Sequence, residues 1–403
     1  MRPIALTFHL GKITERVISD LIKCDLPKMR NQYAYTKELS TTDALVKFSS
    51  DISAGLDKTD TVTLQALLLD FSKAFDRMRP DIAVSKLLSL NVSPSLVKVT
   101  MSFLTNRQQQ VKSQGKLSKQ KPSRIGVPQG TILGPLLWNV FVNDLDPNTN
   151  HIKYADDTTL YNTVRLGDVE ISDSTAHRAT ISFTQNPLQE AASYAAAWCD
   201  SNEMLLNTTK SMCISFTLQK HLTVEPITIN GCEIEQKEEV KLLGVTFDSH
   251  MRFSTHVDNI IRRTKPAFHA IIRLKKAGLT PTNLVLFYKS RIVSILTYCS
   301  PSWYPYISGN DKTKLERYER LCLRIILPNI DSYDEQLGLL NLSPINAQLD
   351  ASCTRYIEKI RNSHDHPLHH YIPVAPNHLH HANRYRPRNR TALMDKNVFV
   401  KYL

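Results

Sequence analysis

The spacing of apolar residues along the chain predicts a protein that mixes helices with strands. Two sets of apolar positions near the N-terminus recur at helical spacing: Ile13, Val17, Ile18 and Leu21, then Ala44, Leu45 and Phe48. From about residue 61 to residue 248, short apolar runs alternate with helical stretches. This alternation favours an α/β or α+β layer.

Four segments of the middle region carry specific predictions. Leu64–Phe71 is a buried strand, and Ile82–Leu90 is a helix with a proline and an aspartate at its start. Ile152–Tyr161 forms two strands around a tight Asp-Asp turn, and Val240–Phe247 is another strand. The acidic turn therefore lies at the tip of a predicted hairpin.

The C-terminal third differs from the middle region in pattern and in charge. Ser254–Leu327 has helical periodicity, with one apolar face made of Leu315, Tyr318, Cys322 and Ile325. His364–Arg390 is rich in His, Pro, Asn and Arg, and its only acid is Asp365. We expect this last segment to be an extended or disordered basic arm.

Composition restricts the class of protein. The chain has 403 residues, 42% of them apolar, which is enough for two or three domains with real cores. The longest nearly apolar run, Ile132–Val142, is too short to span a bilayer, and the N-terminus shows no secretory signal, so we expect an intracellular protein of the nucleus or cytoplasm. Seven cysteines without a C-x-x-C pair favour reduced thiols over a zinc site or disulfides.

The placement of charge suggests a partner. The formal net charge is +12, and residues 251–330 hold 14 Lys and Arg against 4 Asp and Glu. Such a segment is typical of a surface that binds a polyanion, most often nucleic acid. A solvated charged face is the plainer interpretation, and charge alone does not decide between the two.

Three carboxylates provide the candidate chemistry. The apolar strand that begins at Leu64 delivers Asp70 at its end, and Asp156 and Asp157 form the acidic turn. A buried or crowded carboxylate needs a counter-charge, and a hard divalent cation with oxygen ligands supplies one. If folding brings the three together, they can hold two ions about 3.5–4 Å apart, the arrangement for in-line phosphoryl transfer.

A glycine-rich segment lies between these acids. Gly126–Pro135 reads Gly-Val-Pro-Gln-Gly-Thr-Ile-Leu-Gly-Pro and precedes an apolar helix. Glycine permits close approach of the backbone to a ligand, and Gln129 offers both a donor and an acceptor. The alternative is a plain turn that caps the helix.

In this order and wording the segments resemble the motifs of reverse transcriptases from non-LTR (LINE-type) retrotransposons, in particular the jockey-like branch. Residues 70–76, 126–135 and 153–161 resemble motifs A, B and C. Further similarity covers nearly the whole chain: Arg2–Ile4, Ser40–Leu45, Phe103–Arg107, Asn207 with Lys210, Leu243–Val245, Tyr298–Trp303 and Lys314–Leu327.

The resemblance implies a right-hand polymerase of α+β class. It would have partial fingers in residues 1–60, a palm of antiparallel sheet with packed helices in residues 61–250, a helical basic thumb in residues 251–330, a helical C-terminal extension in residues 331–363 and a basic His/Pro/Arg-rich arm in residues 364–403. It also implies a fragment that lacks upstream fingers and an endonuclease.

The implied activity is RNA-directed DNA synthesis. The partners would be an RNA template, a DNA primer with a free 3′-OH and dNTPs, with two Mg²⁺ ions (or Mn²⁺), no small-molecule cofactor and no membrane. The residues that the resemblance assigns to catalysis and to the metals are Asp70, Asp156 and Asp157, with Phe71 lending its backbone carbonyl.

The resemblance also assigns residues to nucleotide and primer. Those implied to contact the incoming nucleotide are Arg2, Phe75, Gln129, Gly130 and Lys210. Phe75 would be a steric gate against the ribose 2′-OH, or else a core phenylalanine. Lys210 would lie near the pyrophosphate, or else be a solvated lysine. Leu243 and Gly244 would form the primer grip.

Two other functions remain open from the sequence. An RNA-dependent RNA polymerase would share the carboxylates, although a bulky Phe75 disfavours ribonucleotides. A catalytically inactive nucleic-acid-binding remnant would need none of the acids. The dense histidines from His364 to His381 allow a metal site, an RNA-contacting arm or a solvated tail.

Overall fold

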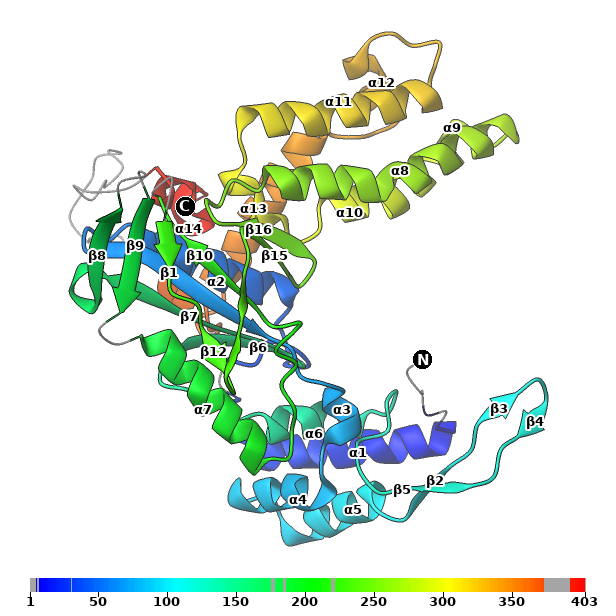
Figure 1. The fold of residues 1–403 in the computed structure, drawn as a ribbon. Coiled ribbons are helices and arrows are strands. Elements are labelled where there is room, and N and C mark those ends of the chain that lie inside the picture. Colours follow the sequence, from blue (N-terminus) through cyan, green and yellow to red (C-terminus); the bar gives the residue numbers. More distant parts are fainter. Residues whose placement is uncertain are drawn as a thin grey trace.

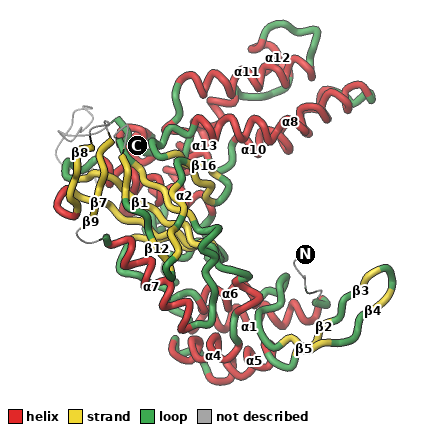
Figure 2. Tube along the Cα trace, in the orientation of Figure 1, coloured by secondary structure: helices red, strands yellow, loops and turns green. Residues whose placement is uncertain are grey.

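The computed structural model describes residues 5, 7–29, 31–174, 178–183, 186–218, 222–372 and 392–402. A central layer built on a β-sheet lies between two helical parts (Figures 1 and 2). We call α1, α4, α5 and α6 the lower helical lobe, and α8 to α11 the basic helical lobe. The mixed α/β class predicted from the pattern is confirmed.

The central sheet has five strands in the order β14-β10-β1-β7-β6. Its strands are β1 (Thr61–Leu69), β6 (Asn150–Tyr154), β7 (Asp157–Arg165), β10 (Met212–Phe216) and β14 (Glu235–Gln236). The pairings of β1 with β10 and β7, and of β6 with β7, are antiparallel. The edge strand β14 pairs in parallel, so the sheet is antiparallel only across the four strands β10, β1, β7 and β6.

Strand β1 is buried from Val62 to Leu69 because helices cover both of its faces. Leu64, Ala66 and Leu68 join the core that contains α2 (Thr41–Leu56). Leu67 and Leu69 join a second core on the other face, with α6 and α7. A strand that is buried on both sides reads as a continuous apolar run rather than an alternating one.

The second core contains the lower helical lobe. The helices of the lobe are α1 (His9–Asp25), α4 (Pro80–Ser89), α5 (Pro94–Leu104) and α6 (Leu133–Phe141). The helices α3 (Ala74–Arg77) and α7 (Pro187–Ser201) contribute to the same core. The predicted helix at α1 is confirmed, but its stripe of Ile13, Val17 and Leu21 is exposed. Its buried face instead holds Glu15, whose carboxylate accepts the Ile132 backbone N–H at 2.6 Å.

Several short strands lie outside the central sheet. They are β2 (Arg107–Gln109), β3 (Lys112–Ser113), β4 (Lys116–Leu117), β5 (Lys121–Ser123), β8 (Val169–Ser174), β9 (Arg178–Phe183), β11 (Leu222–Val224), β12 (Thr228–Ile229), β13 (Cys232–Glu233), β15 (Glu239–Leu242) and β16 (Val245–Asp248). The predicted single strand Val240–Phe247 is therefore wrong: it is the hairpin β15–β16, because a turn at Leu243 and Gly244 reverses the chain.

The basic helical lobe confirms the helical prediction for Ser254–Leu327. Its helices are α8 (Ser254–Lys276), α9 (Pro281–Tyr288), the π-helical segment Lys289–Val293, α10 (Ser294–Leu296) and α11 (Gly309–Ile326), followed by α12 (Tyr333–Leu339) and α13 (Ile345–Arg361). The predicted apolar face of α11 is inward, with Leu315 and Cys322 fully buried. Within the described chain, no helix is both long and apolar enough to cross a membrane.

The prediction of an extended arm from residue 364 onward is wrong for the parts that the structure describes. Leu368, Val398 and Phe399 are buried in the main core, and α14 (Val398–Lys401) packs near α2. Residues 373–391, with all four arginines of the predicted arm, lie outside the described residues. The few apolar residues that pack into the core lie near the two ends of this segment, at Leu368 and at Val398 and Phe399. The polar residues between them dominate its composition, which is why the sequence predicted an arm.

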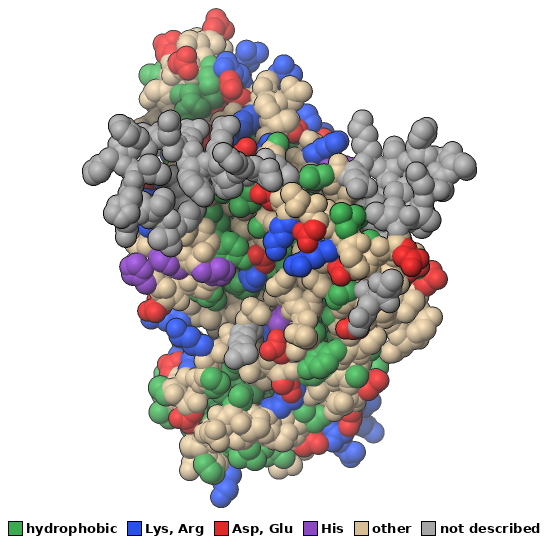
Figure 3. Space-filling model, turned by 90° about the vertical axis from the view of Figure 1, so that its left-hand side faces the viewer, with side chains coloured by type: hydrophobic (Ala, Val, Ile, Leu, Met, Phe, Trp, Pro, Cys, Tyr) green, Lys and Arg blue, Asp and Glu red, His purple; other side chains and the backbone are tan. Residues whose placement is uncertain are grey.

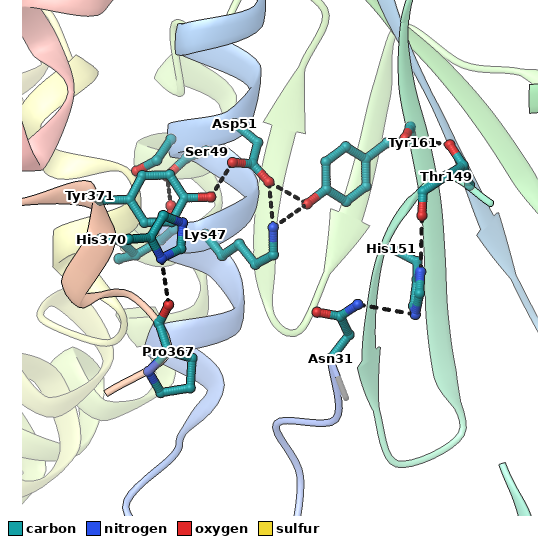
Figure 4. A network of polar contacts seen from close by, with 12 residues as sticks. Asn31, Lys47, Ser49, Asp51, Thr149, His151, Tyr161, Pro367, His370 and Tyr371 are labelled. Carbon is teal, nitrogen blue, oxygen red and sulfur yellow. Dashed lines mark hydrogen bonds and ion pairs between the residues drawn. The ribbon is translucent and has the colours of Figure 1, made fainter. Parts of the chain in front are cut away.

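A buried polar network attaches this C-terminal segment to the central layer (Figure 4). The Asp51 carboxylate on α2 accepts the Tyr161 hydroxyl at 2.5 Å and pairs with Lys47 at 2.6 Å. Its other oxygen accepts the Tyr371 hydroxyl. Since Tyr161 lies on β7, the network joins the C-terminal segment to the strand that begins with Asp157.

Candidate active site

The register of the central sheet brings the first predicted carboxylate to the hairpin. Leu69, the last residue of β1, pairs with Thr158 of β7. Asp70 follows Leu69 and Asp157 precedes Thr158, so the antiparallel register places these two acids opposite each other. Directly opposed residues in such a pair have Cβ atoms about 4.5–5.5 Å apart.

The hairpin turn consists of Ala155 and Asp156, not of two aspartates. Tyr154 pairs with Asp157, which makes Asp157 the first residue of β7 and corrects the predicted Asp-Asp turn. Ala155 has φ of 56°, a left-handed conformation that costs about 1–2 kcal/mol for a residue with a Cβ. The Trp138 indole N–H donates to the Ala155 carbonyl at 2.7 Å, and the Ala155 N–H donates to the Gln32 side chain at 3.2 Å.

The acids interact electrostatically. Desolvation, followed by the negative charges of Asp156 and Asp70, raises the pKa of Asp157 to about 6. The Asp157 side chain keeps some exposure to solvent. Its pKa is therefore raised by two effects together, partial burial and the negative charge of its neighbours. The repulsion that Asp157 experiences shows that the three acids lie close enough to interact.

A divalent cation fits the chemistry of this donor set. Oxygen-only ligands with mutual repulsion are what Mg²⁺ and Mn²⁺ prefer, and a cation would lower the raised pKa of Asp157. Among the described residues, no group of three or more Asp, Glu, His or Cys side chains is already gathered closely enough to hold a metal. The metal-ligand roles of Asp70, Phe71, Asp156 and Asp157 therefore stay predictions.

A cleft of ≈1120 Å³ opens beside the acids. The predicted residues that line it are Asp70, Phe71, Phe75, Gln129, Gly130, Asp156 and Lys210. A second hollow of ≈100 Å³ is lined by Asp70, Asp157, Lys210 and Leu243. Asp70 and Lys210 thus border both spaces. Arg2 lies outside the described residues.

The amide of Gln129 is held by Asp76, a residue to which the sequence motifs assign no role. Its Nε2 donates to the Asp76 carboxylate at 2.9 Å, and the Gln129 carbonyl accepts the Ala5 N–H at 2.7 Å. A carboxylate accepts only from the NH₂ end of the amide, so Asp76 fixes which end of Gln129 remains available to the cleft. Asp76 lines the cleft six residues after Asp70.

Backbone contacts fasten the glycine-rich segment to the segment after Asp70. Gly126 N–H donates to the Met78 carbonyl, and Val127 N–H donates to the Phe75 carbonyl, each at 2.8 Å. Gly126 has φ of +80°, and a Cβ there would lie 2.6 Å from the Asp76 carbonyl oxygen. Only glycine meets both conditions, because the backbones touch at this point.

Arg107 supports the same segment from outside. Its guanidinium donates to the carbonyls of Leu104, Ile125 and Gly126. Burial lowers the pKa of Arg107. The similarity of Phe103–Arg107 to the reverse transcriptases gave this arginine no role, and the structure shows that it binds backbone carbonyls.

The aromatic residues after Asp70 differ in environment. Phe71 is buried, with its ring 6.3 Å from Trp138 and 6.2 Å from Trp198. Phe75 is only partly buried; its ring lies 5.0 Å from Trp138 and reaches the cleft. Phe75 is therefore both packed and accessible, which is compatible with either prediction made for it.

Two basic side chains in the cleft were not predicted. Lys73 and Arg77 follow Asp70 by three and seven residues, and both line the cleft with Lys210. The buried Nε of Arg77 has no hydrogen-bond partner among the described residues. Lys73 and Arg77 are four residues apart, at the start and the end of the short helix α3. This helical spacing was the only feature of the sequence that could have placed them on the same side.

The Leu243-Gly244 turn is held from the basic helical lobe. Both residues have positive φ, 46° and 91°, as the two-residue hairpin turn requires. The Tyr298 hydroxyl donates to the Leu243 carbonyl at 3.0 Å. A Cβ on Gly244 would lie 3.2 Å from the Tyr298 ring. Tyr298 thus braces this turn next to Asp157.

Lys153, two residues before the turn, is fully buried. Its ammonium donates to the carbonyls of Val142 and Leu145 at 3.1 and 3.0 Å, beyond the C-terminus of α6. Desolvation lowers its pKa to about 8, against the opposing charges of Asp146 and Asp144. The hairpin is therefore attached to the end of α6 through one side chain.

Comparisons with known proteins place this arrangement in context. The family model described as "Reverse transcriptase (RNA-dependent DNA polymerase)" matches residues 1–247. The chain is 27% identical over 395 residues to "Probable RNA-directed DNA polymerase from transposon BS" of Drosophila melanogaster, covering 93% of this chain and 42% of that protein. It is 28% identical over 305 residues to "RNA-directed DNA polymerase from mobile element jockey" of the same organism, covering 74% and 32%.

The chain thus spans less than half the length of these relatives. Among solved structures, "Structure of telomerase from Candida Tropicalis in complexe with TWJ fragment of telomeric RNA" matches with a TM-score of 0.40 and 10% identity, covering 90% of this chain and 56% of that one.

Proposed function

Because this chain belongs to the reverse transcriptase (RNA-dependent DNA polymerase) family, we propose that it is the polymerase core of an RNA-directed DNA polymerase from a LINE-type retrotransposon. It extends a primer 3′-OH with dNTPs on an RNA template. The observation that carries this proposal is the register that sets Asp70 against Asp157 beside the ≈1120 Å³ cleft.

The three carboxylates would hold two Mg²⁺ ions. When bound, such ions supply charge stabilisation for the attacking and leaving oxygens of an in-line displacement. Asp70 borders both hollows and Asp156 lies on the side of the large cleft, while Asp157 lies on the side of the small hollow with Leu243. We assign the nucleotide to the large cleft and the primer terminus to the side of the small hollow.

The walls of the cleft would select and hold the nucleotide. Phe75 limits the space at the sugar, and Gln129, with its amide set by Asp76, faces the base or the template. Lys210 is exposed between the two spaces and would place a positive charge near the leaving pyrophosphate. Arg2 and Gly130 complete the proposed nucleotide contacts.

In this proposal the parts of the molecule have the roles of a right hand. Residues 1–60 correspond to partial fingers, residues 61–250 to the palm and residues 251–330 to a basic thumb. Residues 331–363 form the helical extension. The β15–β16 turn at Leu243 and Gly244 would grip the primer, braced by Tyr298.

Primer extension on an RNA template with Mg²⁺ tests the proposal. The protein is expected to add dNTPs, and Asp70→Asn is expected to abolish addition while it still binds the primer–template. Asp200→Asn, an exposed acid on α7, removes the same charge away from the cleft and should extend normally. Extension by Asp70→Asn at the wild-type rate contradicts the assignment, and a wild type that binds but never extends favours the inactive remnant.

A further inference from the structure

The segment between α5 and Gly126 forms a two-stranded ribbon with an unusual composition. Residues 107–124, which we call the basic ribbon, contain six Lys and Arg, five Gln and no acid. Strand β2 pairs with β5 and β3 pairs with β4, each antiparallel. A left-handed turn at Gln114 and Gly115, with φ of 49° and 78°, closes its tip.

The basic ribbon stands free of the rest of the protein. Every residue from 108 to 122 is exposed, and a Cβ added to Gly115 would meet no atom within 4 Å. An isolated two-stranded hairpin has no core of its own and is marginally stable in water. Its attachment is the base, where Arg107 binds the carbonyls of Leu104, Ile125 and Gly126.

The charge of the basic ribbon is uncompensated within the described chain. None of its lysines, at positions 112, 116, 119 and 121, forms an ion pair with an acid that the structure describes. The face of the molecule turned away from the ribbon differs, since lysine and arginine are interspersed there with acids (Figure 3). Positive charges that lie close together on an exposed ribbon repel one another, and a polyanionic partner would relieve this repulsion. The ribbon is therefore expected to bind a polyanion.

The position of the basic ribbon indicates which polyanion it would bind. It extends from the lower helical lobe on the same side of the molecule as the far ends of α8 and α9 (Figure 1). Its base continues directly into Gly126 and the segment that holds Gln129, which lines the cleft, whereas Leu243 of the β15–β16 turn lines the small hollow. A strand that enters past Gln129 would therefore meet the ribbon before it reaches the acids.

We propose that the basic ribbon binds the single-stranded RNA template ahead of the cleft. The direction of the strand rests on the proposed function; the binding itself does not. Lysines along a ribbon neutralise successive phosphates, and glutamine amides donate and accept without regard to base. The ribbon has no aromatic residue, so base stacking does not contribute and binding is electrostatic and independent of sequence.

The test compares two charge-matched variants of the full chain. One carries K112Q, K116Q, K119Q and K121Q in the basic ribbon, and the control carries K23Q, K58Q, K98Q and K359Q, four exposed lysines elsewhere. Binding of a fluorescent oligo-U RNA is measured by anisotropy at several salt concentrations. The slope of log K against log salt is expected to become about 3 units less steep in the ribbon variant, at about 0.7 per lost phosphate contact. Circular dichroism checks that both variants fold.

Three outcomes would overturn the inference. The ribbon variant could keep the wild-type slope, or the control could lose as much slope as the ribbon variant. Polyglutamate could also compete with the RNA as well as unlabelled RNA does, which would indicate an acidic protein partner. Failure of the polymerase proposal is distinct: a wild type that binds RNA through the ribbon but never extends a primer leaves the ribbon inference intact.

Discussion

Replacing Lys153 by methionine tests the electrostatics that hold the acidic hairpin. Lys153 is fully buried, and its ammonium is bound to backbone carbonyls beyond the C-terminus of α6. Burial lowers the pKa of the lysine from 10.5 to about 8. Methionine keeps a similar length and apolar volume but does not titrate, so the variant removes one defined protonation equilibrium.

The sign of the effect follows from proton binding. Between pH 8 and 10.5 the unfolded chain keeps the proton on residue 153 while the folded chain releases it, so this group stabilises the fold increasingly as pH rises. At pH 7 the lysine is charged in both states and contributes no pH dependence. With these pKa values the gain between pH 7 and pH 9.5 is about 2 kcal/mol.

Urea unfolding followed by circular dichroism at pH 7, 8, 9 and 9.5 measures this gain. The free energy of unfolding of the wild type minus that of Lys153→Met is expected to rise by about 2 kcal/mol. The difference is needed because buried cysteines act in the opposite direction: burial raises the pKa of Cys213 to about 12, which lowers stability over the same range. Lys98→Met, an exposed lysine on α5, should show a flat difference.

Two results would refute the reasoning. A flat difference for Lys153→Met would mean that the ammonium reaches solvent in the folded protein. A difference that stays flat up to pH 9.5 and falls only above about pH 10 would mean that attraction by Asp144 and Asp146 exceeds the cost of burial, so that the pKa of Lys153 is raised instead of lowered. In either case the attachment of the hairpin to α6 would need another explanation.

Three further variants test the proposed contacts of nucleotide and primer. Phe75→Val should raise rNTP incorporation relative to dNTP at least about 10-fold in single-nucleotide assays, and unchanged selectivity would leave Phe75 a core residue. Tyr298→Phe removes a 3.0 Å hydrogen bond to Leu243 and should raise KM for the primer about 5-fold with KM for dNTP unchanged; an equal rise in both would indicate general loosening. Asp76→Asn allows the Gln129 amide to rotate by about 180° and should raise KM for dNTP about 10-fold at unchanged melting temperature. An unaltered KM would mean that Asp76 has no part in nucleotide binding.

The parts of the site that could be predicted from the sequence are those fixed by local pattern. An apolar run that ends in Asp70 reads as a buried strand, and the alternation around residues 152–161 reads as a hairpin. The proximity of Asp70 to the hairpin then required only that the two strands pair. The mixed class of the fold and the helices from Ser254 onward were predictable for the same reason, because their apolar residues recur at the period of a strand or of a helix.

The contacts that could not be predicted join side chains to distant backbone. Lys153 reads as a solvated lysine in the sequence, yet it binds carbonyls 8 and 11 residues earlier in the chain. Arg107 binds carbonyls across 18 and 19 residues. Carbonyls carry no residue identity, so no pattern of side chains marks them as partners. The exposed apolar stripe of α1 could not be predicted either. Periodicity predicts a helix, but it does not show which face of the helix other elements cover.

The geometry of the cleft also argues that its two functional walls behave as one body. Gly126 and Val127 are hydrogen-bonded to the carbonyls of Met78 and Phe75, and Gln129 is bound to Asp76. The segment that follows Asp70 is thus fixed to the glycine-rich segment at three points within four residues. Under the proposed function, a displacement of Gln129 toward an incoming base would carry Phe75 with it, so selection at the base and selection at the sugar would be mechanically coupled. The basic ribbon joins this body through Arg107, so a template bound as proposed would have a direct route to influence both.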